Sequence, residues 1–207
     1  MSEQDIITLA RGGDQAAFTT LVRTYQTAIY NLCYRMLGEA DQARDAAQET
    51  FLRAYTQLHR YDPERPFKTW LFSIASHYCI DRLRRRRVIW MDIDDEPLAG
   101  HPALRERRAG PEDAVLRREQ AADVQALLET LPPKDRIAVV MLYWHDLSYQ
   151  EIAEATGTTV SAVKSRLHRA RAAMADSLRT RDARREAPGQ APRTTLAHPT
   201  ALLSASA

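Results

Sequence analysis

The sequence predicts an all-α protein made of two small helical domains joined by a flexible acidic linker, with a helix-turn-helix in the second domain. Three observations support this fold class. Apolar residues recur every three to four positions within residues 14–37, 41–59 and 67–78 of the first domain, and again within residues 112–131, 137–144 and 160–174 of the second. Only 7 of the 207 residues are glycine, while good helix formers are abundant. Between the two periodic stretches the pattern fades and acidic residues gather.

The composition limits the kinds of site to expect. Hydrophobic residues make up 44% of the chain, which is enough to bury a core in each domain. Cys33 and Cys79 sit in apolar helical patterns without a CxxC pair, so we expect reduced core thiols, and neither a metal nor a cofactor. No apolar run approaches the roughly 20 residues that cross a bilayer, and no signal peptide opens the chain. We therefore expect a cytoplasmic protein without membrane insertion.

The first domain, residues 1–87, should contain three main helices. The first spans residues 14–37 and ends at Gly38, and the second spans about residues 41–59 before Tyr61-Asp62-Pro63 breaks it. The third begins near Phe67 and runs into a cluster of arginines. Together they predict a compact bundle that ends in a basic helix.

The outer face of the second helix is unusual because a leucine lies among its polar residues. This face consists of Asp45, Gln48, Glu49, Leu52 and Arg53. It fits a small protein-docking spot. It also fits an ordinary amphipathic helix with one exposed leucine, and on this pattern alone we favour the ordinary helix.

Aromatic and basic residues alternate through residues 61–87. This mixture suits opened, single-stranded DNA, because unpaired bases stack on rings while arginines hold phosphates. The alternative is that the rings belong to the core, and we assign Trp70 and Tyr78 to it. Phe67 lies where the loop meets the helix, and there we expect its ring to face a ligand.

Residues 88–111 are predicted to be the linker, and residues 179–207 a disordered tail. The linker is interrupted by Pro97, Pro102 and Gly110 and has an acidic group at residues 92–96. The tail is rich in alanine, proline, threonine and arginine and has little apolar order.

The second domain, residues 112–178, contains the helix-turn-helix. Ser148 and Glu151 form a capping box that begins its first helix, and Gly157 ends that helix. In the following helix, polar side chains lie opposite an apolar stripe, and no acidic residue occurs in residues 156–175. A helix face with basic residues and no acidic ones predicts contact with DNA. The alternative is a basic surface that contacts only solvent. It explains less well why the capping box, the turn glycine and the basic helix face occur together.

Four segments in this order resemble a known family. They are DAAQETFLRAY at residues 45–55, FKTWLFSIASHYCIDRLRR at residues 67–85, LETLPPKDRIAVVMLYWHDLSYQEIAEATG at residues 128–157 and VKSRLHRARAAM at residues 163–174. With them the chain resembles bacterial RNA polymerase sigma factors of the small, two-domain extracytoplasmic-function (ECF) group. It departs from the family pattern at His77, where asparagine is usual, and at Ser161-Ala162, where Gly-Thr is common.

The resemblance implies a non-enzymatic initiation subunit that binds core RNA polymerase, recognises the −10 and −35 promoter elements and helps to melt DNA. It implies that core polymerase is bound by Asp45, Gln48, Glu49, Leu52 and Arg53. It implies that opened −10 DNA is bound by Tyr61, Arg65, Phe67, Lys68, Ser73, His77, Arg82, Arg84 and Arg85. It implies that duplex −35 DNA is bound by Ser161, Lys164, Ser165, Arg166, His168, Arg169 and Arg171.

The same resemblance implies an anti-sigma protein as a further partner. For the acidic linker it leaves two interpretations open: a nucleic-acid mimic in the polymerase channel, or a solubilising tether. A stand-alone helix-turn-helix regulator is the alternative function, but it leaves the Leu52 face and the arginine helix unexplained. An enzyme acting on nucleic acid would need clustered carboxylates or histidines, and the only dense acidic group lies in the linker.

Overall fold

The computed structural model describes residues 1–91 and 112–186, and within these ranges every regular element is a helix. The first domain contains α1 (Glu3–Arg11), α2 (Gln15–Leu37), α3 (Ala40–Gln57), the 3₁₀ turn η1 (Leu58–Arg60) and α4 (Phe67–Met91). The second contains α5 (Glu112–Glu129), α6 (Pro133–His145), α7 (Tyr149–Ala155) and α8 (Val160–Glu186). The predicted all-α fold with a helix-turn-helix in its second half is confirmed.

Three element boundaries differ from the expectations. A first helix, α1, was not predicted, although Ser2 and Asp5 form a capping box at its start. Helix α4 continues to Met91, so the first four residues of the expected linker are helical. Helix α8 continues to Glu186, so the tail expected from residue 179 was wrong for residues 179–186. The other expected linker and tail residues lie outside the described ranges.

Local signals explain where the main helices begin and end. The Asp14 carboxylate caps α2 by accepting from the Ala16 and Ala17 amides at 2.8 and 3.0 Å. Gly38 ends α2 in the left-handed conformation, at φ 83°, which glycine adopts without strain. Glu151 and Ser148 bond reciprocally at the start of α7, as the capping box predicted.

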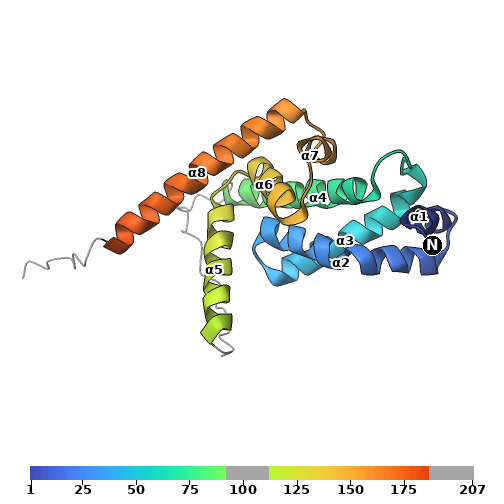
Figure 1. Cartoon of the computed structure of the whole chain (residues 1–207), viewed down its shortest axis with the longest axis horizontal. Coiled ribbons are helices and arrows are strands. Elements are labelled where there is room, and N and C mark those ends of the chain that lie inside the picture. Colours follow the sequence, from blue (N-terminus) through green and yellow to red (C-terminus); the bar gives the residue numbers. More distant parts are fainter. Residues whose placement is uncertain (92–111, 187–207) are drawn as a thin grey trace, which may run out of the picture.

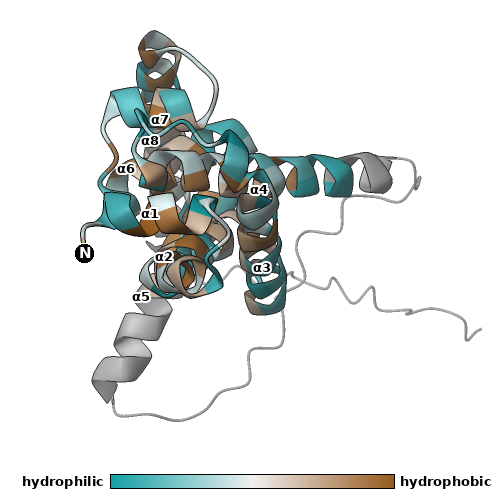
Figure 2. Cartoon of the chain, turned by 90° about the vertical axis from the view of Figure 1, so that its right-hand side faces the viewer, coloured by the Kyte–Doolittle hydropathy of each residue, from teal (hydrophilic) through white to brown (hydrophobic). Residues whose placement is uncertain are grey.

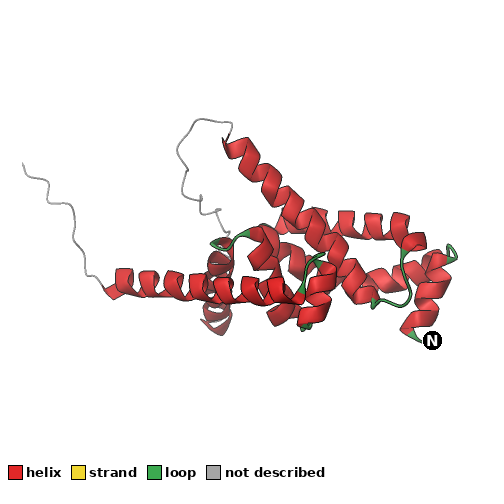
Figure 3. Ribbon diagram, turned by 90° about the horizontal axis from the view of Figure 1, so that it is seen from above, coloured by secondary structure: helices red, strands yellow, loops and turns green. Residues whose placement is uncertain are grey.

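The buried side chains of both domains form one hydrophobic core. Helices α2, α3 and α4 pack together, α1 lies on α2, and α6, α7 and α8 form the second group (Figure 1). The two groups touch, because α6 packs on α2 and α7 packs on α4. Apolar residues concentrate where the helices meet (Figure 2). From above, α8 and the distal part of α4 extend beyond this body (Figure 3). Within residues 1–91 and 112–186, none of the helices combines the length and the hydropathy that a bilayer-spanning helix needs.

Cys33 on α2 and Cys79 on α4 are both fully buried and carry free thiols. Contact with the Cys79 thiol and burial raise the pKa of Cys33 far above its ordinary value. We therefore expect neither thiol to react with a thiol reagent such as Ellman's reagent in the native protein, while both react after denaturation. Rapid reaction of one or two thiols under native conditions would contradict this packing.

Candidate polymerase and nucleic-acid surfaces

Helix α3 presents the leucine-centred face to solvent. Leu52 is 57% exposed, and the side chains of Asp45 and Gln48 beside it are also exposed. The Arg53 guanidinium accompanies this face: its Nε donates to Glu49 Oε1 at 2.7 Å, and its Cζ lies 4.9 Å from the centre of the Tyr78 ring. The opposite face of α3 packs on the core through small alanines, so Leu52, which lies on the outer face, is not buried. Leu52 therefore forms an exposed apolar spot surrounded by polar side chains.

Phe67 does not face a ligand in this structure. It is only 4% exposed, and it packs against Tyr25, Tyr61 and Trp70 with ring centres 5.5–5.6 Å apart. Tyr61 is likewise buried, and its hydroxyl donates to the Arg65 carbonyl. The expectation for the Phe67 ring was wrong because the loop folds its two aromatic ends inward. The exposed part of the loop is residues 62–66, which include Arg65.

Helix α4 carries the remaining residues expected near opened DNA, but it does not place them on one uniform surface. His77, Arg84 and Arg85 are exposed, whereas Ser73 and Arg82 are half-buried. Arg82 Nη1 donates to the Tyr78 hydroxyl at 3.2 Å. Lys68 stands apart from this group, since its ammonium donates to the carbonyl of His145, in the second domain, at 2.7 Å.

Helix α8 displays a polar, basic face at its amino-terminal half. Ser161, Lys164, Ser165 and His168 are exposed, while Arg166 is half-buried. Thr159 Oγ1 accepts from the Ala162 amide at 3.2 Å and so caps the helix start. The buried stripe of α8 packs on α6 and α7, which turns the polar side chains outward. Such a helix suits the major groove of duplex DNA.

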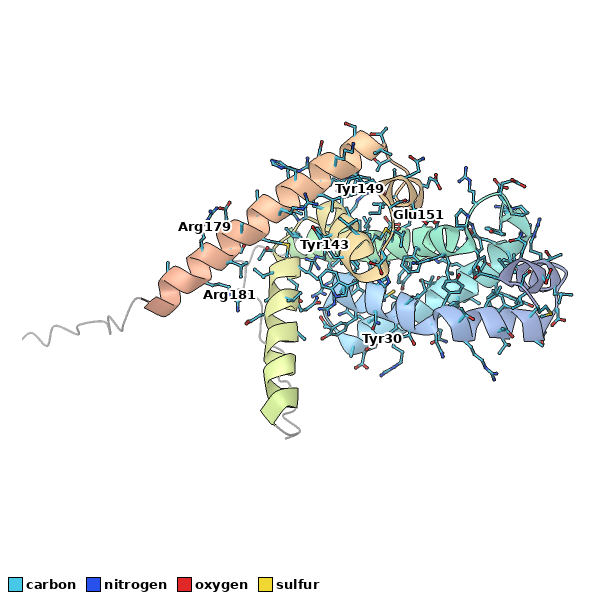
Figure 4. The ribbon with its side chains drawn as sticks, in the orientation of Figure 1. Tyr30, Tyr143, Tyr149, Glu151, Arg179 and Arg181 are labelled. Carbon is cyan, nitrogen blue, oxygen red and sulfur yellow. The ribbon has the colours of Figure 1, made fainter. Side chains whose placement is uncertain are left out.

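Two arginines of α8 also hold the domain together. Arg169 forms a bidentate pair with the buried Asp135 of α6, at 2.9 and 3.2 Å. Arg171 Nε donates to the Tyr143 hydroxyl at 3.1 Å, and hydrogen bonds with Tyr143 and Tyr149 raise its pKa. Tyr143 and Tyr149 come from α6 and α7 (Figure 4). Arg169 therefore has a structural partner, whereas Lys164 is exposed without one in the hydrogen bonds of the described chain.

Comparison with known proteins decides the family. The family model for sigma-70 region 2 matches residues 21–88, and the model for sigma-70 region 4 matches residues 121–174. The chain is 40% identical to the ECF RNA polymerase sigma factor SigW of Bacillus subtilis, over 81% of this chain and 91% of that protein. This chain belongs to the ECF sigma factors.

Two further likenesses agree with this assignment. The RNA polymerase sigma-H factor of Pseudomonas aeruginosa is 35% identical to this sigma factor, over 85% of this chain and 93% of that protein. The solved structure of CnrH in complex with the cytosolic domain of CnrY is also similar to this chain. The match covers 86% of this chain and 97% of the matched chain in that structure. Its TM-score is 0.65 at 26% identity.

The contacts between regions 2 and 4 of this sigma factor were not anticipated from the sequence. Arg136, Gln125 and His145 looked like ordinary members of amphipathic helices, but they are buried at 6%, 2% and 7% exposure. A signal was present, because all three are polar residues on the apolar stripes of α5 and α6. Polar residues at such positions need partners. Gln125 and Arg136 find part of theirs in the other domain, as donors to the Arg35 and Met36 carbonyls, whereas the His145 ring packs on Phe72 of that domain.

His145 is held neutral at this junction. Burial and the nearby Lys68 ammonium lower its pKa to about 4, against a smaller opposite effect of Asp146. Its ring meets Phe72 of α4 edge to face, with ring centres 4.8 Å apart. The unfolded chain therefore takes up a proton near pH 6.5, while the folded chain does so only near pH 4.

We accordingly expect the stabilisation from neutral His145 to be complete above pH 6.5 and to be lost as the pH falls toward 4. At pH 5 the loss is about 2 kcal/mol, at roughly 1.4 kcal/mol for each pH unit below the unfolded pKa. Urea unfolding of the parent chain and of His145→Leu at pH 7.5 and pH 5 measures it. The variant should lose less stability than the parent between the two pH values, and equal losses would contradict the assignment.

Proposed function

We propose that this ECF sigma factor binds core RNA polymerase through the Leu52 face, captures the opened −10 element with α4 and the loop before it, and reads the duplex −35 element with α8. It acts as a dissociable initiation subunit in the cytoplasm and performs no bond chemistry itself. The observation that carries the proposal is the presence of two different exposed surfaces on one chain. An apolar spot on α3 suits a protein, and a basic face on α8 suits a polyanion.

The roles of single residues follow from their surroundings. On α3, Leu52 supplies the apolar contact, and Asp45, Gln48, Glu49 and Arg53 surround it. On α8, Lys164, Ser165 and His168 face the base edges, while Ser161, Arg166 and Arg171 lie near the backbone phosphates. Arg169 pairs primarily with Asp135, and its contact with DNA is secondary to this ion pair.

In the −10 surface, the roles divide between charge and shape. Arg65, Arg82, Arg84 and Arg85 position phosphates, and Ser73 and His77 contact bases from α4. The rings of Tyr61 and Phe67 pack together and hold the two ends of the loop in place. Lys68 joins this surface only when its bond to the His145 carbonyl is released.

An anti-sigma protein is part of the proposal. The support is the likeness to CnrH, whose structure was solved as a complex with the cytosolic domain of CnrY. A protein that covers the Leu52 face would prevent polymerase binding without touching DNA-reading residues.

Transcription in vitro tests the polymerase role. Purified chain added to sigma-free bacterial core polymerase and a genomic promoter library should give specific starts. Leu52→Asp should abolish them, because it places a charge at the centre of the apolar spot. The matched control is Leu178→Asp, which changes another exposed leucine, at 45%, outside the proposed surfaces. Binding to duplex DNA without any polymerase-dependent start would favour a stand-alone helix-turn-helix regulator instead.

Duplex binding tests the role of α8. Lys164→Ala should weaken binding to the −35 element of a promoter found in that experiment by about 1–3 kcal/mol and relax its base preference, if the ammonium contacts a base edge. Fluorescence anisotropy with the intact −35 duplex and with single-base variants measures both effects. An unchanged affinity together with an unchanged base preference would remove Lys164 from the reading face.

A further inference from the structure

A pocket lies where α6 packs on α2 (Figure 1). Its volume is about 320 Å³, at the lower limit of the roughly 300–1,000 Å³ that is typical of small-molecule sites. It is lined by Tyr30, Asn31, Tyr34 and Arg35 from α2 and by Trp144 from α6. None of them belongs to the surfaces proposed above for polymerase or DNA.

The four residues from α2 form one continuous strip because of the helical repeat. Residues four positions apart are neighbours on an α-helix, so Tyr30 lies beside Tyr34, and Asn31 lies beside Arg35. The two tyrosine rings are stacked, with centres 6.3 Å apart and planes 18° apart. Tyr30 and Tyr34 are half-buried, whereas Asn31 and Trp144 are exposed, so a ligand can reach the rings from solvent.

Arg35 brings a positive charge to this pocket. Its Cζ lies 4.9 Å from the centre of the Trp144 ring, so the guanidinium covers one face of the indole. The buried Nη1 of the same guanidinium has no hydrogen-bond partner among the described residues. A buried donor without an acceptor costs free energy, and an anion would supply a strong acceptor. Of the described residues that line the pocket, none carries a carboxylate that could take this role.

The rings and the guanidinium together select the chemistry of a ligand. An apolar ligand would cover the rings but leave Nη1 of Arg35 without an acceptor, and a simple anion would leave the rings uncovered. An organic cation suits aromatic rings but is repelled by Arg35. A flat ring that carries an anionic group satisfies both features. The Asn31 amide can also donate to and accept from the polar edge of a nucleobase.

We propose that this pocket binds a free nucleotide, with the base stacked against the rings of Tyr30 and Tyr34 and the phosphate held by Arg35. Every base has a flat π face, so stacking on aromatic side chains accepts any of them. The planar guanidinium of arginine matches the oxygens of a phosphate group. The bound nucleotide would contact both domains, because α2 belongs to the first and α6 to the second. No polymerase or promoter contact takes part in this binding.

Isothermal titration calorimetry of the full chain with AMP and with GMP tests this site. We expect saturable binding of one nucleotide per chain. Adenosine lacks the phosphate and inorganic phosphate lacks the base, so each should bind at least about tenfold more weakly than AMP. Equal affinities for AMP and adenosine would contradict the role of Arg35 as the phosphate ligand.

Two variants remove the proposed contacts. Arg35→Gln removes the charge and Tyr30→Leu removes a ring, and each should weaken AMP binding at least about tenfold. Because Arg35 also lies over Trp144, Tyr30→Leu keeps the test valid if Arg35→Gln fails to fold by circular dichroism. The matched controls are Arg44→Gln and Tyr55→Leu, which change an exposed arginine and an exposed tyrosine of α3 outside the pocket. They should change the affinity by less than about twofold.

Each contrary result has a distinct meaning. The absence of saturable AMP or GMP binding would overturn the nucleotide site. Nucleotide binding that both pocket variants leave unchanged would place the ligand elsewhere on the chain and overturn the assignment to this pocket. A single-stranded oligonucleotide that loses affinity in both pocket variants, while AMP and GMP do not bind, would assign the pocket to a DNA strand and overturn the free nucleotide. None of these measurements includes polymerase, so their outcome is separate from that of the transcription experiment.

Discussion

The arrangement of this sigma factor depends on how the carboxyl end of α2 is completed. A helix end inside a protein must find donors for its last carbonyls, and here Gly38 satisfies only part of that need. Region 4 supplies the rest through Gln125 and Arg136. The two domains therefore share one core, and a local requirement of one helix end is met by hydrogen bonds from the other domain.

This packing divides the proposed binding surfaces into two groups. The Leu52 face and the polar face of α8 point away from the junction and are exposed. The Lys68 side of α4 is at the junction, next to His145 and α7. Under the proposed function, the side chains assigned to polymerase and to duplex DNA are largely exposed already, whereas the Lys68 ammonium, assigned to opened DNA, is hydrogen-bonded to the second domain.

The sequence predicted the helices and the family well, because both depend on local patterns. Apolar periodicity, the Ser148 cap and Gly38 each act within a few residues, and the structure confirms these elements. The sequence did not predict the burial of Phe67, because the Tyr25 ring that packs on it comes from a different helix, α2. The contacts of Arg136 with Met36 and of Lys68 with His145 join residues 100 and 77 positions apart, which periodicity cannot pair. Arg169 was assigned to DNA for its charge, but its partner Asp135 lies 34 positions away.

Region 4 packs on the end of α2, and this packing fixes how the two domains lie. Pulsed electron paramagnetic resonance between spin labels on the exposed faces of α3 and α8 tests it most directly in the full-length free chain. We expect one narrow distribution of short distances. A broad distribution that extends to much longer distances would contradict the packing.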